Sequence, residues 1–204
     1  MHRIGLTGGF CSGKSFVLRV LEEQGCRTLR ADDLAKTIVF APGSPLLQEV
    51  VGIFGPGVLD EGGSLDREKF SQALFEDHGK RQALNAIVHP LVGEERRRLI
   101  REAESTGIYD FLVYESALLL ESGIQGDFER IIVVYSSSAV QLRRAMERDG
   151  LTRAEAQKRI RSQFPLREKL KAAHYAIDTS LGTESTRART LEVFHLLQKD
   201  FHLS

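Results

Sequence analysis

The chain has 204 residues and a formal net charge of zero, because 28 Lys and Arg balance 28 Asp and Glu. A neutral chain carries no global field that would attract nucleic acid or an anionic membrane. Its apolar runs at 117–120 and 131–135 are far too short to span a bilayer. We therefore expect a cytoplasmic protein, a monomer or weak homo-oligomer, with no nucleic-acid or membrane partner.

Short β-rich runs alternate with helical patterns along most of the chain. We expect strands at residues 3–7, 26–30, 109–115 and 131–135, and a less strongly marked one at 175–178. This alternation is typical of a parallel sheet covered by helices. The predicted fold is therefore α/β, with a doubly wound, mostly parallel five-stranded sheet.

A glycine-rich loop follows the first expected strand. Residues 8–15 read GGFCSGKS, which fits the G-x-x-x-x-G-K-S pattern of a phosphate-binding loop. Small residues let backbone amides surround a triphosphate, and the helix beginning near Lys14 offers its positive dipole end. Lys14 would reach the β- and γ-phosphates of ATP, and the Ser15 hydroxyl would bind Mg²⁺. The nucleotide-binding residues expected here are Gly8, Gly9, Cys11, Ser12, Gly13, Lys14, Ser15 and Phe16.

The alternative is a chance match in a glycine-bearing turn. The surrounding pattern disfavours it, because residues 4–7 read as a buried strand and apolar residues recur at helical spacing from Phe16 to Leu21. Gly25 then closes the predicted helix. Strand, loop and helix thus occur in the order that a phosphate loop requires.

Two carboxylates, Asp32 and Asp33, follow the second expected strand. In open α/β sheets the carboxyl ends of the strands form the ligand crevice, so a carboxylate here would face the same crevice as Lys14. It would take the proton of an acceptor hydroxyl in phosphoryl transfer. Either residue could instead cap the helix that continues through Leu34 and Ile38, and spacing alone does not separate the two roles.

Residues 40–106 are too long for a simple crossover between the second and third strands. Pro and Gly interrupt this stretch at 42–45 and 55–57, and apolar stripes at 46–54 and 70–74 have helical spacing. We expect a mostly helical insert. Farther on, helices are predicted at 141–149, from a Thr152–Glu155 capping box to Gln163, and at 184–201.

Charged residues near the third and fourth strands complete the set of candidates. Glu115 ends the third strand, where an acid would hold Mg²⁺ through water; the alternative is a buried carboxylate paired with an arginine. Arginines cluster around Gly150, among them Arg144, Arg148 and Arg159. Most surface arginines are simply solvated. Their density here favours a basic lid that closes over the phosphoryl group, and we expect at least one to contact ATP.

Taken together, these motifs resemble the dephospho-CoA kinase family over almost the whole chain. The resemblance rests on the following runs, in this order: Gly5-Leu6-Thr7-Gly8-Gly9, Ser12-Gly13-Lys14-Ser15, Ala31-Asp32, Leu65-Asp66-Arg67, His89-Pro90, the segment 115–121 (ESALLLE), Gln141-Leu142-Arg143-Arg144, Arg148-Asp149, and Arg159 with Gln163. It implies a phosphate-loop kinase fold in which residues 1–39 and 107–204 form the nucleotide-binding core. Residues of about 149–165 would form a helical lid, and residues 40–106 a helical substrate-binding insert.

The resemblance also implies an activity and roles for individual residues. The reaction would transfer the γ-phosphate of ATP, with Mg²⁺, to the ribose 3′-hydroxyl of dephospho-CoA, with Asp32 rather than Asp33 as the base. Lys14 and Arg144 would join Asp32 in catalysis, and Arg144 and Arg148 would bind ATP. The substrate-binding residues implied are Thr7, Asp32, Arg67, His89, Glu115, Arg159 and Gln163. His89 has an equally good structural alternative, in which it only fixes a turn before Pro90.

Several residues depart from the family pattern. Cys11 stands where glycine is usual, Arg30 and His174 where acids are usual, and Ala117 where proline is usual. Cys11 and Cys26 show no metal-ligand spacing, so both should be reduced thiols.

Other functions fit the sequence less well. A nucleoside or nucleotide kinase would share the fold and the ATP chemistry but not the acceptor. A GTP-dependent switch is disfavoured because Asn85, the only asparagine, is followed by Ala86 and not by the Lys-x-Asp that reads guanine. A nucleic-acid binding module would need a basic face that a neutral chain does not offer.

Overall fold

A computed structural model of the chain describes residues 1–41 and 43–203. It divides into two compact units, one formed by Met1–Arg30 with Ala103–Ser204 and the other by Ala31–Glu102. None of the described helices is both long enough and apolar enough to cross a membrane.

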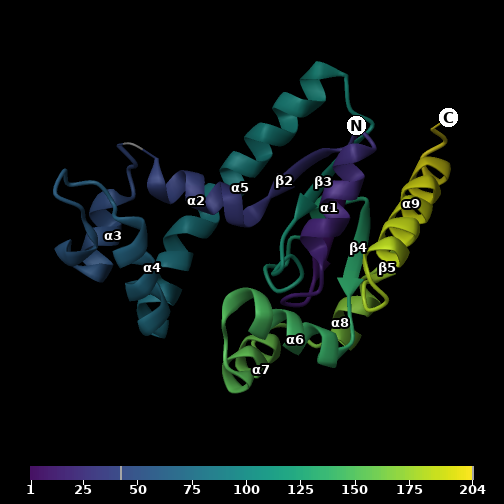
Figure 1. The fold of residues 1–204 in the computed structure, drawn as a ribbon. Helices are drawn as coiled ribbons and strands as arrows, with labels where there is room; N and C mark the ends of the chain where they lie inside the picture. Colours follow the sequence, from purple (N-terminus) through teal and green to yellow (C-terminus); the bar gives the residue numbers. More distant parts are fainter. Residues whose placement is uncertain (42, 204) are drawn as a thin grey trace. The chain divides into compact units, whose positions relative to one another are not determined.

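The first unit is built on a five-stranded sheet (Figure 1). Its strands are β1 (His2–Gly8), β2 (Arg27–Arg30), β3 (Phe111–Glu115), β4 (Arg130–Tyr135) and β5 (Tyr175–Asp178). They lie in the order β2-β3-β1-β4-β5, and each neighbouring pair is parallel. The expected fold class is confirmed, and the sheet is parallel throughout rather than mostly so. The strand bounds differ from the expected ones by one or two residues at most.

The helices of this unit follow the strands as a parallel sheet requires. They are α1 (Lys14–Glu23), α6 (Ser138–Asp149), α7 (Arg153–Arg161), α8 (Leu166–Lys171) and α9 (Thr183–Asp200), with a short 3₁₀ turn at Gln125–Asp127. The capping box at Thr152 and Glu155 is present at the start of α7, and both of its hydrogen bonds form. Gly25, with φ +86°, follows the end of α1 in a left-handed conformation that a glycine adopts without strain.

Both faces of the sheet are buried, which explains the near-continuous apolar runs. In β4, Ile131 to Val134 are each at most 2% exposed. On one face α1 and α9 cover a core that includes Ile4, Leu18, Phe111 and Leu197. An ion pair of 2.6 Å between Arg187 on α9 and Glu23 on α1 joins the two helices at the surface. On the other face Ile131, Leu119 and Phe128 crowd Gly5, where a Cβ atom would lie 2.7 Å from Ile131.

The second unit is helical, as expected for the insert. It contains α2 (Ala31–Phe40), α3 (Leu47–Phe54), a 3₁₀ turn (Pro56–Val58), α4 (Arg67–Glu76) and most of α5 (His78–Thr106). These helices surround an apolar core in which Phe54 and Phe70 pack edge to face, with ring centroids 5.1 Å apart. Val39 of α2 belongs to this core, so the structure groups residues 31–39 with the insert, whereas the sequence assigned them to the nucleotide-binding core.

One local expectation about the insert was wrong. The His89-Pro90 pair was expected to form a turn, but both residues lie inside the 29-residue helix α5. A proline in a helix interior removes one backbone hydrogen bond and usually kinks or ends the helix. Here Leu84, Val88 and Val92 bury one stripe of α5 in the core of the insert, and this packing sustains the helix through Pro90.

Candidate active site

The phosphate loop lies between β1 and α1, and three of its residues have an unusual backbone environment. At Gly8 a Cβ atom would lie 2.0 Å from the backbone oxygen of Val134, so only glycine fits. Gly13, with φ +91°, is the left-handed N-cap of α1. Cys11 also has a positive φ, of 54°. Cys11 thus adopts a left-handed backbone that glycine takes without strain, and this non-glycine residue carries the strain of that conformation.

Lys14 folds back over the loop that precedes it. Its Nζ donates hydrogen bonds to the backbone oxygens of Gly9 (3.1 Å) and Gly8 (3.3 Å). It also lies 3.9 Å from Oε1 of Glu115, and both side chains are nearly buried. Glu115 stands opposite Leu6 of β1 and Arg30 of β2 in the ladder of β3. The sheet therefore brings the lysine of the loop and the acid at the end of β3 to the same edge. The alternative interpretation of Glu115 expected an arginine as its partner, whereas this ion pair is with Lys14.

Two serines of the loop match what a nucleotide phosphate and its metal ion would require. The Ser12 hydroxyl is fully buried, and its Oγ finds no hydrogen-bond partner among the described residues. Burying a hydroxyl without a partner is costly, and a phosphate oxygen would satisfy it. Ser15 is exposed in the first turn of α1. Mg²⁺ takes few protein ligands when phosphates supply the others, and the Ser15 hydroxyl and Glu115 carboxylate are oxygen donors of the kind it prefers.

Arg144 on α6 is anchored near this loop through Thr179, the residue after β5. Its Nη1 donates to Thr179 Oγ1 and its Nη2 donates to the backbone oxygen of Thr179, both at 2.8 Å. Thr179 Oγ1 in turn donates to the backbone oxygen of Ser12 at 2.8 Å. The expected catalytic arginine is therefore connected to the phosphate loop by a buried threonine.

Residues of the expected lid meet the loop at Phe10. Gln163 Oε1 accepts a hydrogen bond of 2.7 Å from the backbone N–H of Phe10. The guanidinium groups of Arg148 and Arg159 lie 5.7 Å and 5.6 Å from the centroid of the Phe10 ring, within the range of cation–π attraction. Hydrogen bonds from Arg148 hold the pKa of Asp149 below its usual range. Two residues of the expected lid, Arg159 and Gln163, and Arg148 just before it thus lie around one residue of the loop.

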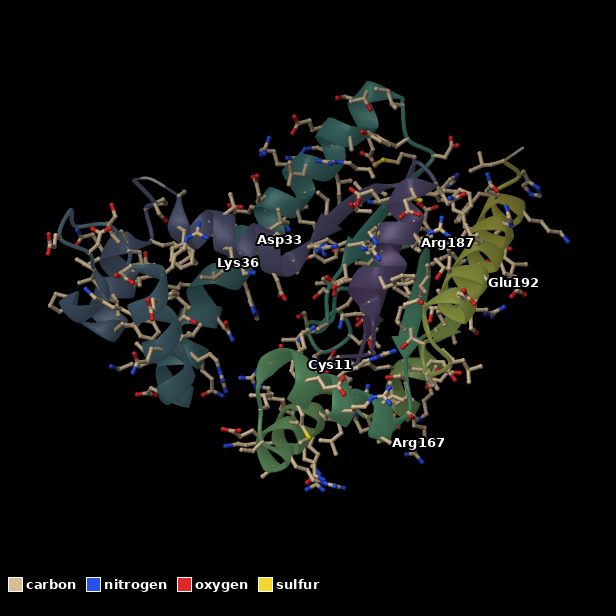
Figure 2. All side chains as sticks on the ribbon, viewed as in Figure 1. Cys11, Asp33, Lys36, Arg167, Arg187 and Glu192 are labelled. Carbon is tan, nitrogen blue, oxygen red and sulfur yellow. The ribbon has the colours of Figure 1, made fainter. Side chains whose placement is uncertain are left out.

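The Cys11 side chain turns away from solvent into a small apolar cluster. It packs with Ala145 of α6 and Ala156 of α7 and is 8% exposed. Cys11 lies beside α6 and α7 in Figure 2 as well. Burial raises the pKa of this thiol, although the nearby Arg148 partly opposes the shift. A protonated thiol is a weak nucleophile, so Cys11 has the properties of a packing residue.

The remaining expected site residues of the first unit include Thr7. It is fully buried and its Oγ1 donates to the backbone oxygen of Ala117 at 3.4 Å. The same oxygen accepts from Nζ of Lys169, at 2.8 Å. The Thr7 hydroxyl therefore bonds to the backbone of the segment after β3. Phe16 is partly buried, with the Arg19 guanidinium 5.2 Å from its ring centroid.

The other expected site residues are described with the insert. Asp32 and Asp33 directly follow β2 and are both exposed in the first turn of α2. Asp33 also appears in Figure 2, near Lys36 of the same helix. Arg67 begins α4, and its guanidinium lies 4.8 Å from the centroid of the Phe40 ring. His89 is exposed on α5.

Sequence reasoning missed three residues that hold this site together. A Cβ atom on Gly9 would lie 2.6 Å from Nε2 of Gln141, so this buried glutamine packs directly on the loop. Thr179 and Lys169 are buried as well. Gln141 lies in the Gln141-Leu142-Arg143-Arg144 run, but the sequence predicts no role for it. Nothing in the local sequence marks Thr179 or Lys169, because their partners lie far away along the chain.

Comparisons with known proteins agree with this geometry. The sequence profile described as "Dephospho-CoA kinase" matches residues 2–184. A dephospho-CoA kinase of Carboxydothermus hydrogenoformans is 44% identical over 190 residues, which are 93% of this chain and 91% of that protein. A crystal structure of a Thermus thermophilus protein has a TM-score of 0.76 at 32% identity and covers 96% of both chains. A dephospho-CoA kinase structure from Campylobacter jejuni, 22% identical, has the same fold, with a TM-score of 0.67 over 97% of this chain and 98% of that chain. The chain therefore belongs to the dephospho-CoA kinase family.

Proposed function

We propose that this enzyme transfers the γ-phosphoryl group of ATP to the ribose 3′-hydroxyl of dephospho-CoA, which is the last step of coenzyme A synthesis. The observation that carries the proposal is the family match over residues 2–184, which extends far beyond the phosphate loop. The phosphate loop alone would suit many kinases, including the nucleoside or nucleotide kinases that remain the alternative. Membership in this family does not favour that alternative.

In the proposed reaction the 3′-oxygen attacks the γ-phosphorus, and the bond from the γ-phosphorus to its bridging oxygen breaks, so that ADP leaves. Asp32 takes the proton of the 3′-hydroxyl as general base. Its exposure in the first turn of α2 leaves the carboxylate open to an acceptor. Asp33 is equally exposed, so the choice of Asp32 rests on its place in the Ala-Asp motif of the family.

Cations stabilise the charge of the transferring group in this proposal. Lys14 exchanges its contacts with the Gly8 and Gly9 carbonyls for the β- and γ-phosphates. Arg144 stabilises the charge that develops as the γ-phosphoryl separates, and Arg148 contacts ATP. Mg²⁺, when bound, would neutralise the phosphate oxygens; Ser15 would hold it directly and Glu115 through water.

Arg67 and His89 of the insert are assigned to dephospho-CoA, together with Thr7, Glu115, Arg159 and Gln163. Residues 40–106 would form the substrate-binding domain and residues of about 149–165 the lid. The contacts of Arg159 and Gln163 with Phe10 support a lid that meets the phosphate loop. We further propose that the enzyme acts in the cytoplasm as a monomer or weak homo-oligomer.

The test is the release of ADP from ATP and Mg²⁺ with different acceptors. Dephospho-CoA, nucleosides, nucleoside monophosphates and no acceptor are compared, and the phosphorylated product is identified by mass spectrometry. We expect dephospho-CoA to stimulate ADP release far more than any other acceptor and to yield CoA. Equal or greater stimulation by a nucleoside monophosphate would rule out the proposed acceptor. A Lys14→Ala variant controls for contaminating kinases, because its loss of ADP release ties the signal to this site.

A further inference from the structure

Thr179 links the phosphate loop to Arg144. It directly follows β5 and is 2% exposed. Its hydroxyl makes two hydrogen bonds: Oγ1 donates its hydrogen to the backbone oxygen of Ser12 and accepts from Arg144 Nη1, both at 2.8 Å. A threonine hydroxyl has one hydrogen to donate, so the direction of this hydrogen bond is fixed.

The bond to Ser12 sets the direction of a loop amide. In a trans peptide the carbonyl and the following N–H point in opposite directions, and this chain has no cis peptide among the described residues. Because Thr179 holds the Ser12 carbonyl on its own side, the N–H of Gly13 points away from Thr179. Thr179 also lies against Gly13, where a Cβ atom would be 3.1 Å from Oγ1. Phosphate loops act through amides oriented in this way.

The bonds to Arg144 fix its side chain. Two of its terminal nitrogens donate to Thr179, one to the hydroxyl and one to the backbone oxygen. A guanidinium has five N–H donors in a rigid plane, so holding two of them fixes the direction of the other three. One hydroxyl therefore couples the conformation of the loop to the orientation of the arginine.

We propose that Thr179 is a positioning residue for ATP, and that its hydroxyl keeps the Gly13 amide and the Arg144 guanidinium in the geometry that the nucleotide phosphates require. This inference rests on the proposed function, which assigns the loop and Arg144 to ATP. Thr179 itself need not touch the nucleotide.

The experiment compares variants that keep or remove the hydroxyl. Thr179→Val has nearly the same shape without the hydroxyl, and Thr179→Ser keeps the hydroxyl without the methyl group. Thr190→Val is the matched control, because Thr190 is a fully buried threonine on α9 whose hydroxyl donates to the Thr186 backbone oxygen and bonds to no other described residue. We expect Thr179→Val to weaken the binding of a non-hydrolysable ATP analogue by about tenfold, since hydrogen bonds to a charged group are lost. Thr179→Ser should stay within about twofold of the parent, and Thr190→Val should bind as the parent does.

A second readout tests the coupling to Arg144. The loss of kcat caused by Thr179→Val should be smaller in an Arg144→Ala background than in the parent, because part of the effect acts through Arg144. Equal losses in the two backgrounds would overturn that part of the proposal. Unchanged affinity in Thr179→Val, or a loss in Thr179→Ser as large as in Thr179→Val, would overturn the role of the hydroxyl.

Two features keep the test decisive. If Thr179→Val does not fold, Thr179→Ala replaces it, and the comparison of Thr179→Ser with Thr179→Ala isolates the hydroxyl at a site that lacks the methyl group in both. Nucleotide binding is measured without any acceptor. If dephospho-CoA is not the acceptor, the nucleotide affinities of these variants still test the role of Thr179. Failure of the proposed function and failure of this inference are therefore distinguishable.

Discussion

Lys169 and Glu121 form a buried ion pair, and removing one partner alone should strongly destabilise the nucleotide-binding unit. Lys169 is 1% exposed, and its Nζ lies 2.8 Å from Oε1 of Glu121 and 2.8 Å from the backbone oxygen of Ala117. Glu121 Oε1 also accepts a hydrogen bond from the backbone N–H of Phe164 at 2.9 Å. The pair thus joins α8 to the segment after β3 and to Phe164.

The two single substitutions should have unequal effects. Glu121→Gln leaves an ammonium group buried without a counter-charge, which costs about 3–5 kcal/mol of unfolding free energy. Lys169→Met leaves a carboxylate that is still 15% exposed and keeps the Phe164 N–H as a donor. Its cost should be smaller, about 1–3 kcal/mol. The double variant Glu121→Leu/Lys169→Met leaves neither charge behind and should lose less than Glu121→Gln alone.

Urea unfolding followed by far-UV circular dichroism measures these differences; the chain has no tryptophan to serve as a fluorescent probe. The exposed pair Arg143–Glu147, 4.0 Å apart, is the control, and Glu147→Gln should change stability by less than about 1 kcal/mol. A loss below about 1 kcal/mol in Glu121→Gln would refute the reasoning. So would a Glu121→Gln/Lys169→Met double variant whose loss equals the sum of the two single losses, because the two charges would then not interact.

Three further predictions concern single groups. Asp32→Asn should lower kcat by about 10² or more with little effect on ATP binding, whereas Asp33→Asn should lower kcat much less. Steady-state kinetics gives kcat, and ATP affinity is measured separately. A larger loss of kcat in Asp33→Asn than in Asp32→Asn would show that the base is misassigned. Because burial raises the pKa of Cys11, iodoacetamide should label this thiol more slowly than a free thiol. The adduct should slow turnover, and bound ATP should protect Cys11 from labelling. A labelled enzyme, identified by mass spectrometry, that kept full activity would contradict this prediction. Burial raises the pKa of Cys26 from 9.0 to about 12. Between these two pH values the Cys26 thiol loses its proton in the unfolded chain but keeps it in the folded chain. The free energy of unfolding should therefore fall as pH rises, by about 1.4 kcal/mol per pH unit. Urea unfolding at several pH values should show a smaller fall in Cys26→Ala than in the parent.

The features that could be predicted from sequence are those encoded by neighbouring residues. Residues 131–134 of β4 are a continuous run of apolar residues, and the capping box of α7 needs only Thr152 and Glu155. The phosphate loop is likewise a motif of eight consecutive residues, 8–15. In each case the physical cause, burial on both faces or a local hydrogen bond, acts within a short stretch of chain.

The features that could not be predicted depend on residues distant in the chain. The bond from Thr179 to Ser12 joins positions 167 apart, and that from Phe10 to Gln163 joins positions 153 apart. No spacing rule connects such pairs before the sheet is assembled. The prediction of a turn at His89-Pro90 was wrong for a related reason. Local propensity favoured a turn there, whereas packing in the core of the insert stabilises the helix.

The phosphate loop is held by side chains from the second half of the chain, and this bears on how it binds ATP. Gln163 takes the Phe10 N–H, Thr179 holds the Ser12 carbonyl, and Gln141 packs on Gly9. These contacts fix the loop backbone before any nucleotide arrives, so ATP binding need not supply the free energy of ordering it. The group that must move is Lys14, which now bonds to two loop carbonyls. In the proposed function, a loop fixed by distant contacts would let anionic phosphate oxygens replace the two neutral carbonyl acceptors of Lys14 while the surrounding amides stay in place.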